Sequence, residues 1–268
     1  MSDRIHGIIA PEISNDVVGE QFSREEDLNR TFTSIENAAV IGLGGIGGSV
    51  AEILGTLSSI RNLILIDDDE IEMSNLNRTI YTYVQIGALK IEAAAKLISS
   101  RNINVAVYPI PIRFNESTSS EVKVILESVS VHRSNYIYVF DCRDDDYNDY
   151  ELWSNMCRDL DMGVKILRAA YNGMSMTLDL QPQNRTVFGR GGYENIASHS
   201  IPSRLIATLI VLYAGYYIYL EEEKPIIFNT PITFDAKMLP EMLFYAHTLM
   251  ATEPNVQNRI KHKLVNTL

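Results

Sequence analysis

A glycine-rich turn is the part of the sequence best suited to chemistry on a nucleotide. Gly42, Gly44 and Gly47 follow an apolar run in the order G-x-G-x-x-G. Glycines let the backbone turn sharply and approach a phosphate closely, and the N-terminus of a following helix offers free N–H groups and partial positive charge. A second apolar run ends at Asp67, whose carboxylate can accept hydrogen bonds from ribose hydroxyls. These residues predict a nucleotide site, and taken alone they also fit a nicotinamide-dependent oxidoreductase.

The hydrophobic pattern around the turn indicates the elements that must hold it. Residues 38–41 and 63–66 are short apolar runs typical of buried strands, and residues 49–57 carry apolar side chains at helical spacing. Helices and strands then alternate at residues 81–100 (a helix, strongest over GALKIEAAAKLIS), 104–112 (strand), 117–128 (helix), 136–140 (strand), 149–160 (helix) and 164–170 (strand). We therefore predict an α/β fold with a Rossmann-like, doubly wound, mostly parallel sheet.

The rest of the chain is predicted to elaborate this core. We expect a short helix before it, and after it a strand, a long loop, an apolar element and a C-terminal helix, at residues 23–30, 175–180, 181–200, 205–220 and 239–250. The apolar run is shorter than the ~20 residues of a membrane span, which favours a buried core element. We predict a single domain, residues 1–268, made of an N-terminal extension (1–37), a nucleotide-binding core (38–170) and an elaborated C-terminal half (171–268).

Composition narrows the classes of partner. The chain has 268 residues, 46% of them hydrophobic, and a formal net charge of −11, which disfavours nucleic acid or an anionic membrane as the main partner. Cys142 and Cys157 form no C-x-x-C pair, so we expect neither a disulfide framework nor a zinc site. The first residues show no apolar core after a basic flank, and we expect a cytoplasmic protein.

The residues that follow Asp67 change the interpretation of the glycine turn. The run DDDEIEMSNLNR, from Asp67 to Arg78, closely resembles the D-x-D-x-V-x-x-S-N-L-x-R signature of the ubiquitin-activating-enzyme superfamily, in its ThiF/MoeB-like adenylyltransferase branch. The turn GLGGIGG, the segment IGALK ending at Lys90 and the D-C-x-D element from Asp141 to Asp144 match the same family in order and approximate spacing. The resemblance extends over about residues 38–170 and is thin outside them.

The resemblance implies a function. Such an enzyme uses ATP and Mg²⁺ to adenylylate the C-terminal carboxylate of a small ubiquitin-like or sulfur-carrier protein with a Gly-Gly tail, giving an acyl-adenylate and pyrophosphate. It is usually a homodimer, and we expect the half formed by residues 171–268 to bind the carrier and to dimerise. Many relatives carry zinc on two C-x-x-C pairs, which this sequence lacks.

Three side chains are predicted to be catalytic. Positioned cations and a metal do most of the work in such a reaction. Arg78 offers a planar fork for phosphate oxygens, Lys90 offers a point charge, and Asp144 follows a buried strand where a carboxylate can hold Mg²⁺. The predicted nucleotide-binding residues are Gly42, Gly44, Gly45, Gly47, Asp67, Asp69, Ser74, Asn75, Arg78, Lys90 and Asp145.

Alternatives remain open at this point. Each of these charged residues could be a solvated surface group, and Asp145 stands where the family more often has asparagine. A non-catalytic, ATP-binding scaffold subunit that partners an active relative would retain the same fold. An oxidoreductase would leave Arg78, Lys90 and Asp144 without a common explanation. The sequence assigns neither cysteine to a thioester.

Overall fold

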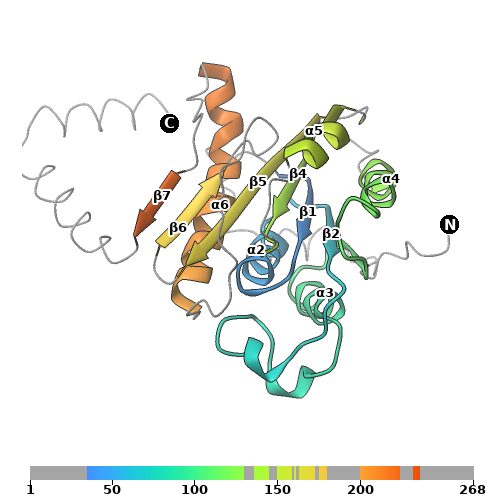
Figure 1. The fold of residues 1–268 in the computed structure, drawn as a ribbon, viewed down its shortest axis with the longest axis vertical. Coiled ribbons are helices and arrows are strands. Elements are labelled where there is room, and N and C mark those ends of the chain that lie inside the picture. Colours follow the sequence, from blue (N-terminus) through green and yellow to red (C-terminus); the bar gives the residue numbers. More distant parts are fainter. Residues whose placement is uncertain are drawn as a thin grey trace, which may run out of the picture.

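The fold is built on one sheet of seven strands in the order β3-β2-β1-β4-β5-β6-β7 (Figure 1). This computed structural model describes residues 35–129, 136–144, 150–158, 160, 163–172, 175–179, 200–223 and 232–235. The strands are β1 (Asn37–Ile41), β2 (Asn62–Ile66), β3 (Ala106–Ile110), β4 (Tyr136–Asp141), β5 (Gly163–Asn172), β6 (Ser175–Asp179) and β7 (Ile232–Asp235). The first five pair in parallel, whereas β6 and β7 add to that sheet antiparallel.

Helices cover both faces of the sheet, which confirms the doubly wound fold. In β1, Ala38 and Val40 pack into a core shared with α2 (Gly45–Gly55), α3 (Lys90–Arg101) and α6 (Ser200–Glu223). The alternate residues Ala39 and Ile41 pack into a second core with α4 (Ser119–Val129) and α5 (Tyr150–Arg158). Because successive strand residues point to opposite faces, an unbroken apolar run such as β1 is what a sheet covered on both sides requires.

Two predicted helix starts are wrong. The first helix begins at Gly45 rather than at residue 49, because the second half of the glycine motif, from Gly45 onward, already has helical main-chain geometry. The next helix, predicted within residues 81–100 and most strongly over residues 87–99, begins at Lys90. Gly87 has a left-handed φ of +82° and Leu89 forms a β-bridge with Glu70, so the residues just before Lys90 are not helical.

The apolar run at residues 205–220 lies inside α6 and is a core element, as predicted, with Ile206, Ala207 and Ile210 fully buried. Among the described helices, none combines the length and the apolarity needed to cross a membrane. The edge strand β7 was not predicted. The helices expected at residues 23–30 and 239–250 lie outside the described residues. The loop expected at residues 181–200 also lies outside them, except for Ser200, which begins α6.

Candidate functional site

The glycine turn connects β1 to α2 and is open at its centre. Gly42 has a φ of +82°, which other residues rarely adopt. A Cβ atom on Gly47 would lie 1.8 Å from the carbonyl oxygen of Gly42, so only glycine fits there. Gly44 precedes α2 with no side-chain cap, and a Cβ atom placed on it would meet nothing within 4 Å. The start of α2 therefore presents main-chain N–H groups beside open space, an arrangement suited to a phosphate.

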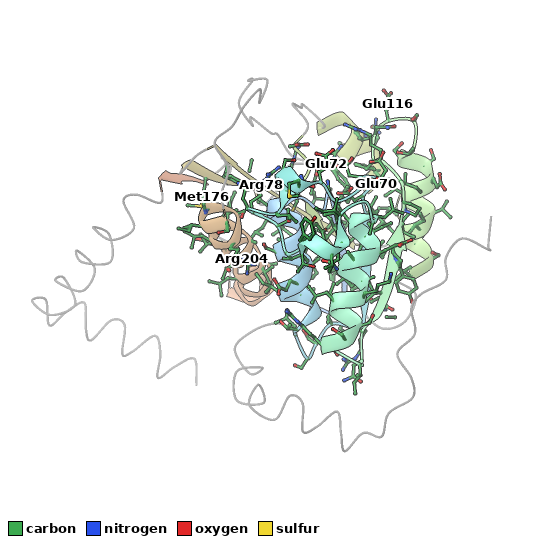
Figure 2. All side chains as sticks on the ribbon, turned by 90° about the horizontal axis from the view of Figure 1, so that it is seen from below. Glu70, Glu72, Arg78, Glu116, Met176 and Arg204 are labelled. Atoms are coloured by element: carbon green, nitrogen blue, oxygen red, sulfur yellow. The ribbon has the colours of Figure 1, made fainter. Side chains whose placement is uncertain are left out.

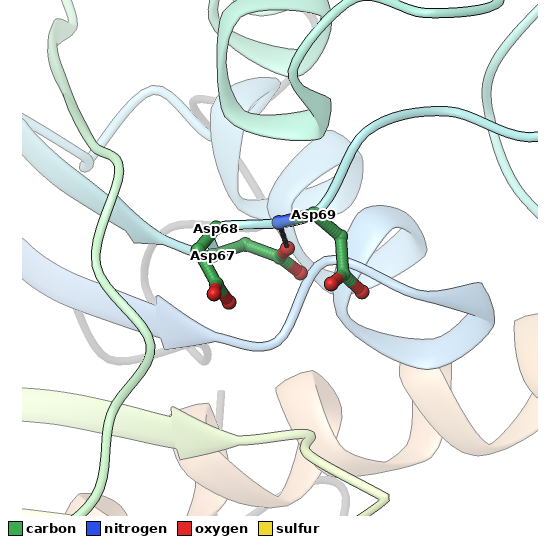
Figure 3. Close-up of side chains that lie close together, drawn as sticks. All are labelled: Asp67, Asp68 and Asp69. Atoms are coloured by element: carbon green, nitrogen blue, oxygen red, sulfur yellow. Dashed lines mark hydrogen bonds between the residues drawn. The ribbon is translucent and has the colours of Figure 1, made fainter.

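Asp67 follows β2 and reaches across to the glycine turn. One of its carboxylate oxygens accepts a hydrogen bond from the main-chain N–H of Leu43, and the other accepts one from Asp69 at 2.8 Å (Figure 3). Burial raises the pKa of Asp67, and the charge of Lys90 together with these amide hydrogen bonds offsets that effect only in part. A carboxylate has acceptor capacity beyond these two bonds, so Asp67 remains suited to ribose hydroxyls.

Three consecutive carboxylates follow the end of β2, and Lys90 neutralises part of their charge. One carboxylate oxygen from each of Asp67, Asp68 and Asp69 lies within 4.8 Å of the other two. Figure 3 shows the three side chains together. The buried Lys90, at the start of α3, places its Nζ 2.5 Å from Oδ2 of Asp69, and its main-chain N–H donates to the Asp69 carbonyl at 3.0 Å. Asp69 thus holds the lysine at the end of β2, the strand next to the one that leads into the glycine turn.

Arg78 packs directly against the first residue of α2. It lies on the crossover segment, residues 67–89, which connects β2 to α3 and loops out in teal in Figure 1. A Cβ atom on Gly45 would be 3.4 Å from both Cγ and the carbonyl oxygen of Arg78. The guanidinium Nη1 donates to the carbonyl of Ser74 at 2.5 Å, and Ser203 of α6 donates to the Arg78 carbonyl at 3.3 Å. Figure 2 shows Arg78 beside α6, and Glu72, which precedes it on the crossover segment, farther from that helix.

Ser74 and Asn75 form the short 3-10 turn that leads to Arg78. The Oδ1 atom of the buried Asn75 accepts a hydrogen bond from the main-chain N–H of Glu72 at 3.1 Å, and its carbonyl accepts one from Arg78 at 3.2 Å. The hydroxyl of Ser74 donates to the Glu72 carboxylate at 3.1 Å. Asn75 therefore shapes the turn itself, and the predicted contacts of both residues with a phosphate remain a prediction.

Asp144 leaves the sheet at the same edge as the glycine turn. It is exposed and follows β4, which lies beside β1. The preceding residue, Arg143, packs its main chain on the turn, since a Cβ atom on Gly42 would lie 3.0 Å from the Arg143 nitrogen. Because β2, β1 and β4 are adjacent and parallel, Asp67, Gly42 and Asp144 all follow the carboxyl ends of their strands and lie on the same side of the sheet. Asp145 lies outside the described residues.

A buried ion cluster anchors the segment that leaves β4. The Asp141 carboxylate accepts hydrogen bonds from Nε and Nη2 of Arg143 and from Nε1 of Trp153, each at 2.9 Å, and Nε of Arg168 lies 3.3 Å away. Arg143 also donates to the carbonyl of Phe114 at 3.1 Å. Burial alone would raise the pKa of Asp141, but the charges of Arg143 and Arg168 outweigh it and hold the pKa well below its usual value.

The sequence did not point to all of these contacts. It gave no sign that Tyr81, an aromatic residue in an irregular segment, would donate its hydroxyl to the Leu43 carbonyl at 2.9 Å. Nor did it single out Ser203. Arg143, placed between two aspartates of the D-C-x-D element, was a signal that could have predicted the ion cluster.

The buried Cys142 is poorly suited to nucleophilic chemistry. Burial, and secondarily the charge of Asp141, raise the pKa of its thiol, so the thiolate is scarce near neutral pH. The side chain packs beneath the glycine turn, with its Cβ 3.1 Å from where a Cβ on Gly47 would lie. This agrees with the absence of any predicted thioester role for Cys142.

Comparison with known proteins places this geometry in a family. The profile of the ThiF family matches residues 18–190, which is more than half of the chain and includes the glycine turn, the crossover segment and Asp144. The chain belongs to the ThiF family. The predicted family is thereby confirmed, and its signature residues are those that the fold gathers at one edge of the sheet.

Curated relatives match this ThiF-family chain over a short stretch only. Ubiquitin-like modifier-activating enzyme 5 of Culex quinquefasciatus is 40% identical over 73 residues, which are 27% of this chain and 18% of that protein. The protein of the same name from Aedes aegypti is 42% identical over 72 residues, with the same two shares. The chain thus matches less than a fifth of the length of these relatives.

Solved structures support the fold over most of the chain. A crystal structure of Escherichia coli MccB with SeMet MccA superposes with a TM-score of 0.62 at 20% identity, covering 84% of this chain and 70% of that one. PaaA superposes with a TM-score of 0.57 at 17% identity, covering 85% and 73%. At this level of identity the likeness establishes the architecture, and it agrees with the predicted Rossmann-like sheet.

Proposed function

We propose that this chain is an adenylyltransferase that activates a carboxylate with ATP. The observation that carries the proposal is the packing of the Arg78 side-chain stem and main chain on Gly45, which places this arginine next to the uncapped start of α2. Asp67 follows β2 beside the turn, and Lys90 is held there by Asp69. Asp144 follows β4, on the other side of β1. An oxidoreductase would leave Arg78, Lys90 and Asp144 without a common explanation.

The reaction needs positioned charge more than proton transfer. A carboxylate oxygen of the acceptor attacks the α-phosphorus of ATP, and a new C–O–P anhydride bond forms. The bond from the α-phosphorus to the bridging oxygen breaks, and pyrophosphate leaves with the electron pair. Both reactants are anionic, so Arg78 and Lys90 lower the repulsion between them and stabilise the charge on the departing pyrophosphate. The N–H groups at the start of α2 hold the nucleotide in place.

The residues present suit a magnesium ion carried in by ATP. Asp144 offers a hard, solvent-exposed carboxylate at the strand edge, and Mg²⁺ is typically held by one or two carboxylates with several waters and substrate phosphates. When bound, the ion would neutralise phosphate charge. Asp145 is proposed as a further oxygen donor beside it.

The substrate we propose is the C-terminal carboxylate of a small ubiquitin-like or sulfur-carrier protein. The name of the curated relatives, ubiquitin-like modifier-activating enzyme 5, supports this class. Crystal structures of MccB with MccA and with ATP support it as well. A peptide carboxylate would use the same site residues. We further propose that the chain works as a homodimer in the cytoplasm, with residues 171–268 binding the carrier.

Pyrophosphate exchange tests the proposal. The full chain is incubated with ATP, Mg²⁺, labelled pyrophosphate and candidate carrier proteins ending in Gly-Gly. Label entering ATP only when carrier and Mg²⁺ are both present is the expected result. ATP binding without exchange with any carrier or peptide would instead identify a scaffold subunit, and binding of NADH or NADPH in preference to ATP would favour an oxidoreductase.

Gly44→Ala tests the position of the phosphates. The added methyl group meets nothing within 4 Å, so we expect the melting temperature to change by no more than about 2 °C. A triphosphate resting on the turn would contact that methyl group, and we expect the Kd for ATP, measured by calorimetry, to rise at least about tenfold. ATP affinity equal to that of the wild type would show that the phosphates lie elsewhere.

A further inference from the structure

The residue at the centre of the glycine turn, Leu43, has both its main-chain N–H and its carbonyl hydrogen-bonded to side chains from other segments. Leu43 lies between Gly42 and Gly44, two residues with the widest backbone freedom. Its N–H donates to the carboxylate of Asp67, and its carbonyl accepts a hydrogen bond from the hydroxyl of Tyr81 at 2.9 Å. Both polar groups of this one peptide segment are therefore tied to other parts of the chain.

The Tyr81 hydrogen bond also joins two halves of the nucleotide site. Tyr81 lies three residues after Arg78 on the crossover segment, and its hydroxyl reaches a residue 38 positions earlier in the chain. Tyr81 is 6% exposed. Burial, and then the charge of Asp67, raise the pKa of its hydroxyl, which stays protonated and able to donate throughout the neutral range.

We propose that Tyr81 is a positioning residue for ATP, whose hydroxyl holds the main chain of Leu43 so that the glycine turn stays shaped for the triphosphate. The inference rests on the proposed use of ATP at this site. A turn flanked by glycines loses much conformational freedom when it binds a phosphate. Fixing it beforehand removes that loss from the binding step, and affinity for the phosphates rises accordingly.

The test is Tyr81→Phe in the full chain, with Tyr108→Phe as the matched control. The phenylalanine keeps the buried ring and removes only the hydroxyl. The hydroxyl of Tyr108 also donates one hydrogen bond, to Oδ1 of Asn62 at 3.3 Å. Asn62 begins β2 and therefore lies at the amino-terminal end of that strand, away from the glycine turn. Calorimetry then gives the Kd of each protein for ATP with Mg²⁺ and for adenosine, which carries no phosphate.

We expect Tyr81→Phe to weaken ATP binding about threefold to tenfold while adenosine binding changes by less than about twofold, the loss of one buried hydrogen bond. Tyr108→Phe should leave both constants unchanged. ATP affinity equal to wild type in Tyr81→Phe, or equal losses for ATP and adenosine, would overturn the positioning role alone. A wild-type chain that binds no ATP would overturn the proposed function, and the positioning role with it.

Discussion

Arg78→Ala is expected to lower carrier-dependent pyrophosphate exchange by about 100-fold to 10,000-fold, the range seen when a charge that stabilises a transferring phosphate is removed. Arg78 lies against Gly45, at the start of the helix that we propose holds the phosphates of ATP. Its guanidinium bonds to Ser74 and Asn77 only within its own turn, so the fold does not depend on it. We expect the melting temperature to stay within about 2 °C of the wild type.

Two further variants separate a loss of chemistry from a general loss of charge. Asp144→Ala should reduce exchange as severely as Arg78→Ala, and raising the Mg²⁺ concentration should restore part of it, because the proposed metal contact is weakened. Arg101→Ala is the matched control. Arg101 ends α3 far from the turn and pairs with Glu52 on the surface, and its loss should leave exchange unchanged. Near-normal turnover in Arg78→Ala or Asp144→Ala would remove that residue from the catalytic set.

The architecture could be predicted because it depends on local hydrophobic patterns in the sequence. Unbroken apolar runs such as residues 38–41 and 63–66 are strands with both faces buried, and the regular alternation of helix and strand correctly indicated a mostly parallel sheet. The position of Asp67 and Asp144 on one side of the sheet follows from the same logic, since carboxyl ends of adjacent parallel strands meet. Arg78 reaches that side through the packing of the crossover segment on Gly45, which no local pattern indicates. The antiparallel strand β7 was missed because residues 232–235 are too short to stand out.

What the sequence did not reveal are contacts between residues distant in the chain. Leu43 and Tyr81, or Arg78 and Ser203, are linked by single hydrogen bonds across 38 and 125 positions, and no periodicity marks either pair. The glycines were also interpreted too uniformly. Gly47 is required by a close approach to the Gly42 carbonyl, whether or not it also contacts a phosphate, and only the packing of α2 on β1 makes this requirement visible.

Asp141→Asn is expected to lower the free energy of unfolding by about 3–5 kcal/mol, the cost of breaking a buried ion pair from one side. Asparagine keeps the shape of the side chain but leaves the guanidinium groups of Arg143 and Arg168 buried without the carboxylate that neutralises them. Trp153 donates its Nε1–H to the same carboxylate and is the single tryptophan of the chain. Its fluorescence during urea unfolding therefore reports on the cluster itself.

The same variant should change how stability depends on pH. The pKa of Asp141 is depressed in the folded state, so in acid the unfolded chain binds a proton that the folded chain does not. The stability that Asp141 contributes is fully present above its unfolded pKa, about 4, and is lost progressively as the pH falls below it. Unfolding curves at pH 7, 5, 4 and 3 should show a constant gap between wild type and Asp141→Asn down to about pH 5 and a narrowing gap below.

Glu52→Gln provides the matched control for this cluster. Glu52 also faces two arginines, Arg101 and Arg204, but on the solvent side of α2, α3 and α6, where an ion pair is worth about 0–1 kcal/mol. A loss in Asp141→Asn no larger than in Glu52→Gln would contradict the buried cluster. A large loss confined to Asp141→Asn would support a segment leading to Asp144 that is anchored in the core, together with the glycine turn on which Arg143 packs. The carboxylate proposed to bind metal would then be held in place by the same buried cluster.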